Sequence, residues 1–247
     1  MNDISLVMTS GLVFFALYLS YKDKIGLEKE LIIGSIRAIL QLTLIGFVLT
    51  YVFNLNNYGI TTLILLLMVY NAATVAAKRG QGIYNILKIS FIALLISLIF
   101  TLGSLLLFGA VKYQPSEVIP ISGMIVGNSM IAAGLVFNSL REKFQHRREE
   151  VEIKLCLGAN PKEASLTIIR ETVKTAMQPT VDSMKTLGIV QLPGMMTGLI
   201  LAGLPPAAAI KYQIMVAFML TGAVAVTAFL ASYSAYKSFF NSMEQLR

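Results

Sequence analysis

The chain has 247 residues, of which 56% are hydrophobic and only 13% are charged, and its mean hydropathy is +0.72. Soluble domains carry roughly 25% charged residues, so this composition excludes an ordinary soluble fold and indicates a membrane protein. The net charge of +7 fits basic cytoplasmic loops and contact with anionic lipid, and we expect no nucleic-acid partner.

Seven apolar stretches are long enough to cross a bilayer, which takes about 20 helical residues. They are predicted at residues 4–21, 31–53, 58–77, 87–111, 120–140, 186–204 and 212–236. The sequence therefore predicts an all-α polytopic membrane protein with about seven transmembrane helices. It forms a single transmembrane domain over residues 1–247, with a polar helical insert at about 141–185.

The positions of Lys and Arg predict the orientation of this domain, because these residues collect in cytoplasmic loops. With seven spans, the segments after the first, third, fifth and seventh span share one side, and they hold most of the Lys and Arg. We therefore expect an outside amino terminus and a cytoplasmic carboxyl terminus. The first stretch could instead be a secretory signal, but its basic residues follow the apolar run, which favours a retained helix.

The second predicted span contains Arg37 and Gln41, which are four residues apart and so share a helical face. A charge at membrane depth costs about 2.5–3.5 kcal/mol on insertion scales, so it usually faces protein or an aqueous cavity. Alternatively, Arg37 reaches the headgroups by snorkelling. The fourth span is apolar all round, and we expect it to face lipid.

The fifth predicted span begins at Pro120, which suits the first turn of a helix. Asn128, Ser129 and Met130 follow at about mid-membrane. Polar side chains at that depth need a partner, which is either a neighbouring helix or a substrate.

The insert begins with the charged run RREEVEIKLCL, which is typical of a solvated helix. Gly158 allows this helix to stop, and Asn160, Pro161 and Glu163 form the pattern of a capping box that starts a second helix. We expect this second helix to end near Pro179. Two short helices joined by a tight turn are suited to docking a soluble partner.

The sixth predicted span contains Pro193, which we expect to bend the helix. Met195 and Met196 offer thioethers and Thr197 a hydroxyl. Thioethers prefer soft metals such as Cu(I), but methionines also fill gaps in helix interfaces. The candidates for a substrate pathway are thus Arg37, Gln41, Asn128, Ser129, Met130, Pro193, Met195, Met196 and Thr197.

Several kinds of site are missing from the sequence. One cysteine, Cys156, and one histidine, His146, make neither an internal disulfide nor a zinc cluster. No carboxylate falls inside a predicted span, which disfavours an ion-driven carrier, and an intramembrane enzyme would need a catalytic constellation that is not found. No phosphate-binding loop G-x-x-x-x-G-K-[ST] occurs, so any ATP would be hydrolysed by another chain.

The strings PISGMIVGNSM, VEIKLCLGANPKEA and LGIVQLPGMMTG, together with RAILQL, resemble the UPF0014 family of bacterial iron-export permeases, whose plant relatives are associated with aluminium tolerance. The resemblance covers about residues 30–236. Leu199 departs from it, because the family is expected to have Gln there. The insert also resembles the loop by which permeases of ATP-binding-cassette transporters engage their ATPase.

The resemblance implies a permease subunit in the bacterial cell membrane that exports iron or another metal ion. It implies a cytoplasmic ATPase partner that binds ATP and Mg, a permease homodimer, and no cofactor on this chain. The residues implied in ATPase coupling are Glu152, Leu157, Gly158, Ala159, Pro161, Glu163 and Ala164. The alternatives are an ion-coupled secondary carrier and an ATP-binding-cassette permease for a small organic or chelated solute.

Overall fold

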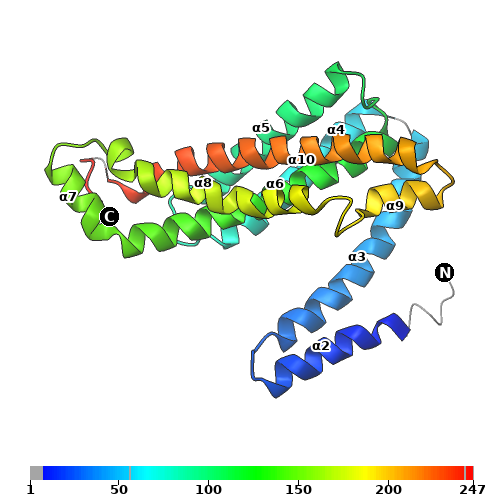
Figure 1. Cartoon of the computed structure of the whole chain (residues 1–247), viewed down its shortest axis with the longest axis horizontal. Helices are drawn as coiled ribbons and strands as arrows, with labels where there is room; N and C mark the ends of the chain where they lie inside the picture. Colours follow the sequence, from blue (N-terminus) through cyan, green and yellow to red (C-terminus); the bar gives the residue numbers. More distant parts are fainter. Residues whose placement is uncertain (1–7, 56, 242, 247) are drawn as a thin grey trace. The chain divides into compact units, whose positions relative to one another are not determined.

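The computed structural model describes residues 8–55, 57–241 and 243–246, and over these ranges it contains helices and no strand. The predicted all-α fold is therefore confirmed. The chain divides into two compact units, residues 1–57 and residues 58–247, and each is described by itself (Figure 1).

The first unit consists of helices α2 (Gly11–Lys22) and α3 (Glu28–Leu55). Ser20 is buried where they meet, and its Oγ donates a hydrogen bond of 2.8 Å to Glu28 Oε1. Nearly all other side chains of this unit are exposed and most are apolar, as suits helices surrounded by lipid. The predicted first span at 4–21 lies partly outside the described residues.

The second unit contains seven α-helices within its described residues. They are α4 (Tyr58–Lys78), α5 (Ile86–Leu107), α6 (Pro115–His146), α7 (Arg148–Cys156), α8 (Pro161–Thr186), α9 (Gly194–Leu201) and α10 (Pro206–Ala235), and α10 continues into the 3₁₀ turn η1 (Tyr236–Phe239). Helices α6, α8 and α10 lie side by side, α5 packs on α6 and α10, and α4 packs on α5 and α6 (Figure 1). One core surrounds Phe137 and Ile168, and a second surrounds Leu94 and Ile125.

Five described helices are long and apolar enough to cross a membrane, and they cover residues 28–53, 58–78, 86–107, 115–146 and 206–239. They correspond to five of the seven predicted spans. The predicted sixth span, 186–204, is not one helix, because α8 runs to Thr186 and α9 begins only at Gly194. Gly188 has a φ of +80° in the intervening turn, and Pro193 caps α9 instead of bending a continuous helix.

Three further details differ from the sequence prediction. Helix α6 begins at Pro115, so Pro120 lies inside it, and α8 continues past Pro179. Both prolines are exposed. A proline inside a helix leaves the carbonyl four residues earlier without its N–H partner, and on an exposed face this carbonyl is not buried. Helix α5 does not simply face lipid, since Leu94, Ser97 and their neighbours on one face are buried against α4, α6 and α10.

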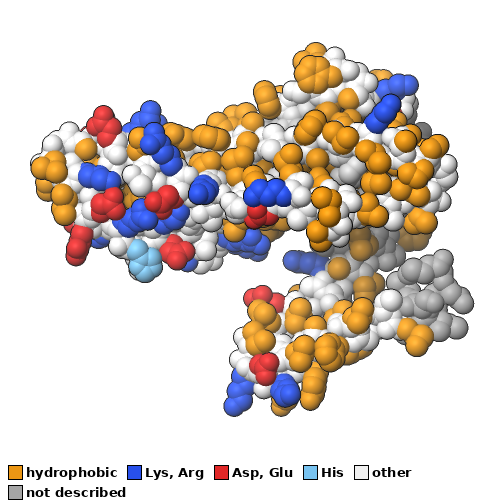
Figure 2. Space-filling model, viewed as in Figure 1, with side chains coloured by type: hydrophobic (Ala, Val, Ile, Leu, Met, Phe, Trp, Pro, Cys, Tyr) orange, Lys and Arg blue, Asp and Glu red, His pale blue; other side chains and the backbone are white. Residues whose placement is uncertain are grey.

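The ends of the second unit can be told apart by their contacts. At one end, the ring of Phe144 stacks on that of Phe239 at 4.2 Å, and Ser238 Oγ donates to the carbonyl of Tyr84 at 3.0 Å. This end therefore gathers the α4–α5 loop, the end of α6 and the carboxyl-terminal segment. At the other end, the rings of Tyr58 and Tyr113 lie 5.7 Å apart. Charged side chains gather at the end that carries α7 (Figure 2).

Candidate functional site

The turn between α7 and α8 is closed on the α7 side by a Schellman motif. The N–H of Gly158 donates to the carbonyl of Leu155 at 3.0 Å, and the N–H of Ala159 donates to that of Lys154 at 3.0 Å. Gly158 has a φ of +93°, a left-handed conformation that costs residues with a Cβ energy. The glycine thus fixes the direction in which the chain leaves α7.

The same turn is closed on the α8 side by the predicted capping box. Asn160 Oδ1 accepts a hydrogen bond from the N–H of Glu163 at 2.9 Å, and Glu163 Oε2 accepts one from the N–H of Asn160 at 3.1 Å. Pro161 occupies the first helical position. Because these bonds satisfy amide groups that a helix start leaves unpaired, the turn has one well-defined shape.

The turn is attached firmly to the rest of the second unit. Val151 of α7 and Ala164 of α8 are almost completely buried in the core that contains Phe137 and Ile168. These two buried side chains link the turn to α6 and α8.

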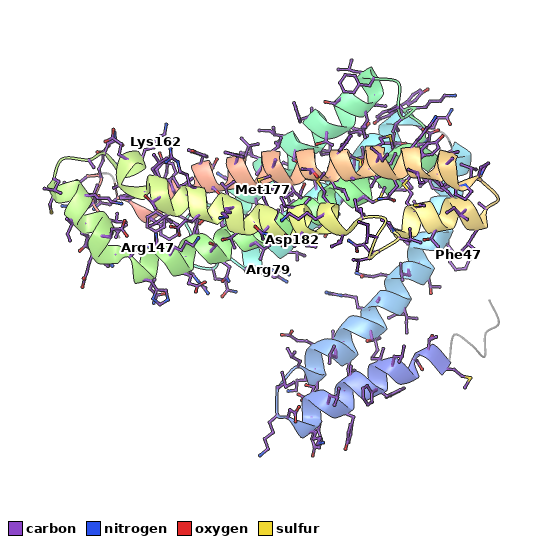
Figure 3. All side chains as sticks on the ribbon, viewed as in Figure 1. Phe47, Arg79, Arg147, Lys162, Met177 and Asp182 are labelled. Carbon is purple, nitrogen blue, oxygen red and sulfur yellow. The ribbon has the colours of Figure 1, made fainter. Side chains whose placement is uncertain are left out.

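An ion-pair cluster joins the end of α6 to α8, and it includes Arg147, the residue that follows α6 (Figure 3). Arg147 Nη1 donates to Glu171 Oε1 at 2.9 Å, and Lys143 Nζ lies 3.4 Å from Glu171 Oε2. The hydrogen bond from Arg147 lowers the pKa of the Glu171 carboxyl, and the two positive charges lower it further. The same bond raises the pKa of Arg147.

The outer surface of the turn is apolar at its tip and charged around it. Leu157 is 82% exposed and Ile153 is 60% exposed, while Glu152 pairs with Arg148 at 2.8 Å. Exposed apolar side chains with a polar rim are typical of a protein-binding surface. The predicted coupling residues therefore come together on one turn, with Ala164 beneath it.

The carboxyl-terminal segment lies next to this turn. The sequence did not predict this contact. Residues 243–246 and the turn line a shallow pocket of about 770 Å³. Asn241 Oδ1 accepts hydrogen bonds from the N–H groups of Met243 and Gln245, both at 2.9 Å. An Asn that closes its own turn in this way is a recognisable sequence signal.

The pathway candidates on α6 are mainly packing residues. Ser129 is buried, and its Oγ lies 3.2 Å from the Oγ of Ser97, which donates to the carbonyl of Ala223 at 2.8 Å. Asn128 Nδ2 donates to the carbonyl of Met124 on its own helix at 2.9 Å. Met130 is half-buried and packs against both cores.

The candidates at α9 lie on a different part of the second unit. Met195 lines a pocket of about 630 Å³ together with Met124 and Met215, and Leu199 lines it too. Met196 and Pro193 are half-buried, and Thr197 is exposed. Ser129 is turned toward α5, whereas Met130 and Met195 both pack against the second core, so the candidates on α6 and α9 are brought together only in part.

Arg37 and Gln41 lie on α3 of the first unit, where both side chains are exposed. Among the described residues, no group of three or more His, Cys, Asp and Glu side chains is placed to hold a metal ion.

Comparisons with known proteins give a consistent picture. A model of the uncharacterised protein family UPF0014 matches residues 3–240. The probable iron export permease protein FetB of Escherichia coli is 44% identical over 242 residues, which covers 98% of this chain and 93% of the relative. The UPF0014 membrane protein YjkA of Bacillus subtilis is 40% identical over 247 residues, covering 100% and 99%. ALUMINUM SENSITIVE 3 of Arabidopsis thaliana is 36% identical over 235 residues, covering 95% and 86%. No solved structure matches the chain.

Proposed function

Because this chain belongs to the UPF0014 family, we propose that it is the permease subunit of an ATP-binding-cassette exporter for iron or another metal ion. A relative named as an iron export permease supports the cargo class. The observation that carries the proposal is the α7–α8 turn, which is capped on both sides and exposes Leu157. A rigid turn with an apolar tip is suited to receive a push from a soluble ATPase.

We further propose seven membrane crossings, with the amino terminus outside and the carboxyl terminus in the cytoplasm. Helix α8 starts at the end of the second unit that carries η1, whereas α10 starts at the opposite end, where Tyr212 and Lys112 line one pocket. The part of α8 after Glu171 and the short helix α9 together cover this distance. Together they would form one interrupted crossing. With the crossings formed by α2, α3, α4, α5, α6 and α10, this makes seven.

In the proposed mechanism, a homodimer of the permease surrounds one path through the lipid bilayer. ATP and Mg bind to the partner ATPase, and this chain holds no cofactor. Closure of the ATPase pushes on Leu157 and the surrounding turn. The buried contacts of Val151 and Ala164 pass this movement to α6 and α8, and α8 leads directly to the interruption before α9.

The docking role is tested in vesicles that contain the chain and its ATPase. Gly158→Ala and Gly158→Pro should both lower metal transport per ATP hydrolysed, because the left-handed turn is disturbed. Gly203→Ala is the matched control, since Gly203 has a φ of +96° but lies beyond α9. If the Gly158 variants keep full coupling, the docking assignment is wrong.

An ion-coupled carrier is the second candidate, and one observation favours it. Asp182 on α8 lies two residues before Met184, whose sulfur lies 2.8 Å from the hydroxyl oxygen of Thr221 in the middle of α10. The carboxylate of Asp182 therefore lies near the depth of the middle of α10, although no predicted span contains a carboxylate. Transport that follows an ion gradient without ATP would support this candidate. Competition between free and chelated metal tests the remaining alternative of a chelated or small organic cargo.

A further inference from the structure

We propose that the exposed polar face of α8, formed by Thr175, Gln178, Asp182 and Lys185, lines the aqueous path through the membrane. Asp182 is the residue on this face that contacts the cation in transit. This inference rests on the proposed transport function and adds to it a position in the path and a class of cargo.

The depth of this face follows from a chain of side-chain contacts. Ser97 lies at the middle of α5, and its hydroxyl donates to the carbonyl of Ala223 on α10. Two residues before Ala223, the hydroxyl oxygen of Thr221 lies 2.8 Å from the sulfur of Met184 on the last turn of α8 and 2.8 Å from the carbonyl of Ala217 on its own helix. The last turn of α8 is therefore level with the middle of α5 and α10. In Figure 3, Asp182 lies well along α8, away from Lys162 at its start.

The two faces of α8 differ along the helix. Nearer its start, the face toward α6 and α10 is buried and includes Ile169, Val173 and Ala176. At the depth of Asp182, this face carries the half-buried Val181 and Met184. The opposite face, with Gln178 and Asp182, is exposed.

On α5 and α10, the two helices that these contacts place at the same level, the exposed side chains are apolar, whereas Asn71 on α4 is exposed and polar. The exposed apolar side chains include Ile96 and Phe100 on α5, and Phe218 on α10. Polar and charged side chains at membrane depth are costly in hydrocarbon, so they face water or protein. The exposed face of α8 is therefore a wall of the path and not a lipid-facing surface.

The groups on this face form a local network that a cation can enter. Gln178 Nε2 lies 2.9 Å from both carboxylate oxygens of Asp182, and Lys185 Nζ lies 3.3 Å from Asp182 Oδ1. When no cargo is present, Lys185 balances the charge of Asp182. A metal cation would take the place of the ammonium group at this carboxylate.

The backbone adds oxygen atoms beside the same face. Pro179 lacks an N–H, which frees the carbonyl of Thr175 one turn earlier. The chain is also interrupted between α8 and α9, and interrupted helices commonly supply carbonyls to ion sites near the membrane midplane. Carboxylate, amide and carbonyl oxygens suit hard cations better than soft ones, so the face favours an oxygen-preferring metal ion.

Accessibility to water is tested with single cysteines in a Cys156→Ser background, in membranes containing the chain. Gln178→Cys and Asp182→Cys should react with a charged maleimide at least about tenfold faster than Phe100→Cys and Phe218→Cys, because thiolates form and meet the reagent only in water. After solubilisation in denaturing detergent, the same reagent should label all four, which shows that the variants are present in equal amounts. Equal, slow reaction of all four with the charged reagent would overturn the proposal.

The role of the carboxylate is tested by Fe²⁺ transport in vesicles with the partner ATPase. Asp182→Asn should reduce transport at least about tenfold, whereas Asp182→Glu keeps an oxygen ligand pair and should retain most of it. Lys174→Gln, also exposed on α8 but nearer its start, is the control and should transport normally. Normal transport by Asp182→Asn would refute the assignment of this residue.

The two proposals fail in different ways in these experiments. If the unmodified chain with its ATPase moves no metal ion, the proposed function is wrong, whatever the labelling shows. If the unmodified chain transports Fe²⁺ but the cysteines at 178 and 182 stay unreactive, only the path assignment for α8 is wrong.

Discussion

Asn160 fixes the first turn of α8 through a single side-chain oxygen, which accepts from the N–H of Glu163 at 2.9 Å. Replacing an N-cap Asn by Ala costs about 1 kcal/mol. We therefore expect Asn160→Ala to speed hydrogen–deuterium exchange at residues 162–165 severalfold without unfolding the chain. Thr167→Ala, an exposed substitution on the same helix, serves as the control. Unchanged exchange at the start of α8 would contradict the role of the cap.

Glu171 predicts a pH dependence at the same end of the molecule. Its pKa is lowered by Arg147, so its ion pairs stabilise the fold at neutral pH, and this contribution is lost as the pH falls below the ordinary value of 4.5. Glu171→Gln should lower Tm at pH 7, and the difference from the unmodified chain should shrink near pH 4. The stability that these ion pairs contribute is modest, because they are partly exposed to solvent.

Thermal unfolding in detergent at both pH values checks this dependence. Glu149→Gln, which changes an exposed carboxylate of α7, should show little difference at either pH. If the difference in Tm between Glu171→Gln and the unmodified chain is the same at pH 7 and pH 4, the ion pairs of Glu171 are not lost on acidification.

At the scale of elements, Gly80 sets how closely the loop after α4 approaches α6. A Cβ at this position would lie 2.7 Å from the Cβ of Phe137, which is fully buried. Gly80→Ala should therefore cost about 1–3 kcal/mol through overpacking, seen as a lower Tm. Gly127→Ala is the matched control, because no atom lies within 4 Å of its Cβ position. It should be neutral or stabilising by about 0.5–1 kcal/mol.

The elements that the sequence predicted well are those decided by neighbouring residues. The end of α7 depends on Gly158 and the start of α8 on Asn160 with Glu163, all within one turn, so the pattern was sufficient. The buried face of α5 was missed because its small residues gain meaning only from the helices packed on them. The helix break near Pro193 was placed inside one span, since hydropathy does not register an interruption between two apolar segments.

The candidate site was predictable to the same degree. The α7–α8 turn is contiguous in sequence, so the residues that were predicted to couple to an ATPase are neighbours, and their role in coupling stays a prediction. The polar face of α8 was assigned to a cytoplasmic insert, because Asp182 lies in a polar stretch of sequence. The depth of Asp182 in the second unit follows from the contact between Met184 and Thr221. The sequence could not show this contact, because the two residues are 37 apart in the chain.

At the scale of the whole molecule, the proposed topology assigns each end of the second unit to one side of the membrane. The chain has one cysteine, and Cys156 is exposed next to the coupling turn. In intact cells that express the chain without its ATPase, a membrane-impermeant maleimide should leave Cys156 unlabelled. It should react once the membrane is opened or in inverted vesicles. Lys112→Cys in a Cys156→Ser background is the opposite case, because Lys112 is exposed at the other end.

This variant should be labelled in intact cells, which also shows that the reagent is active there. The pair of results follows from the seven-crossing arrangement, in which the basic loops of the second unit face the cytoplasm. Labelling of Cys156 from outside, with Lys112→Cys protected, would invert the orientation and place the coupling turn where no ATPase can reach it. The same measurement therefore tests the topology and a requirement of the proposed transport mechanism.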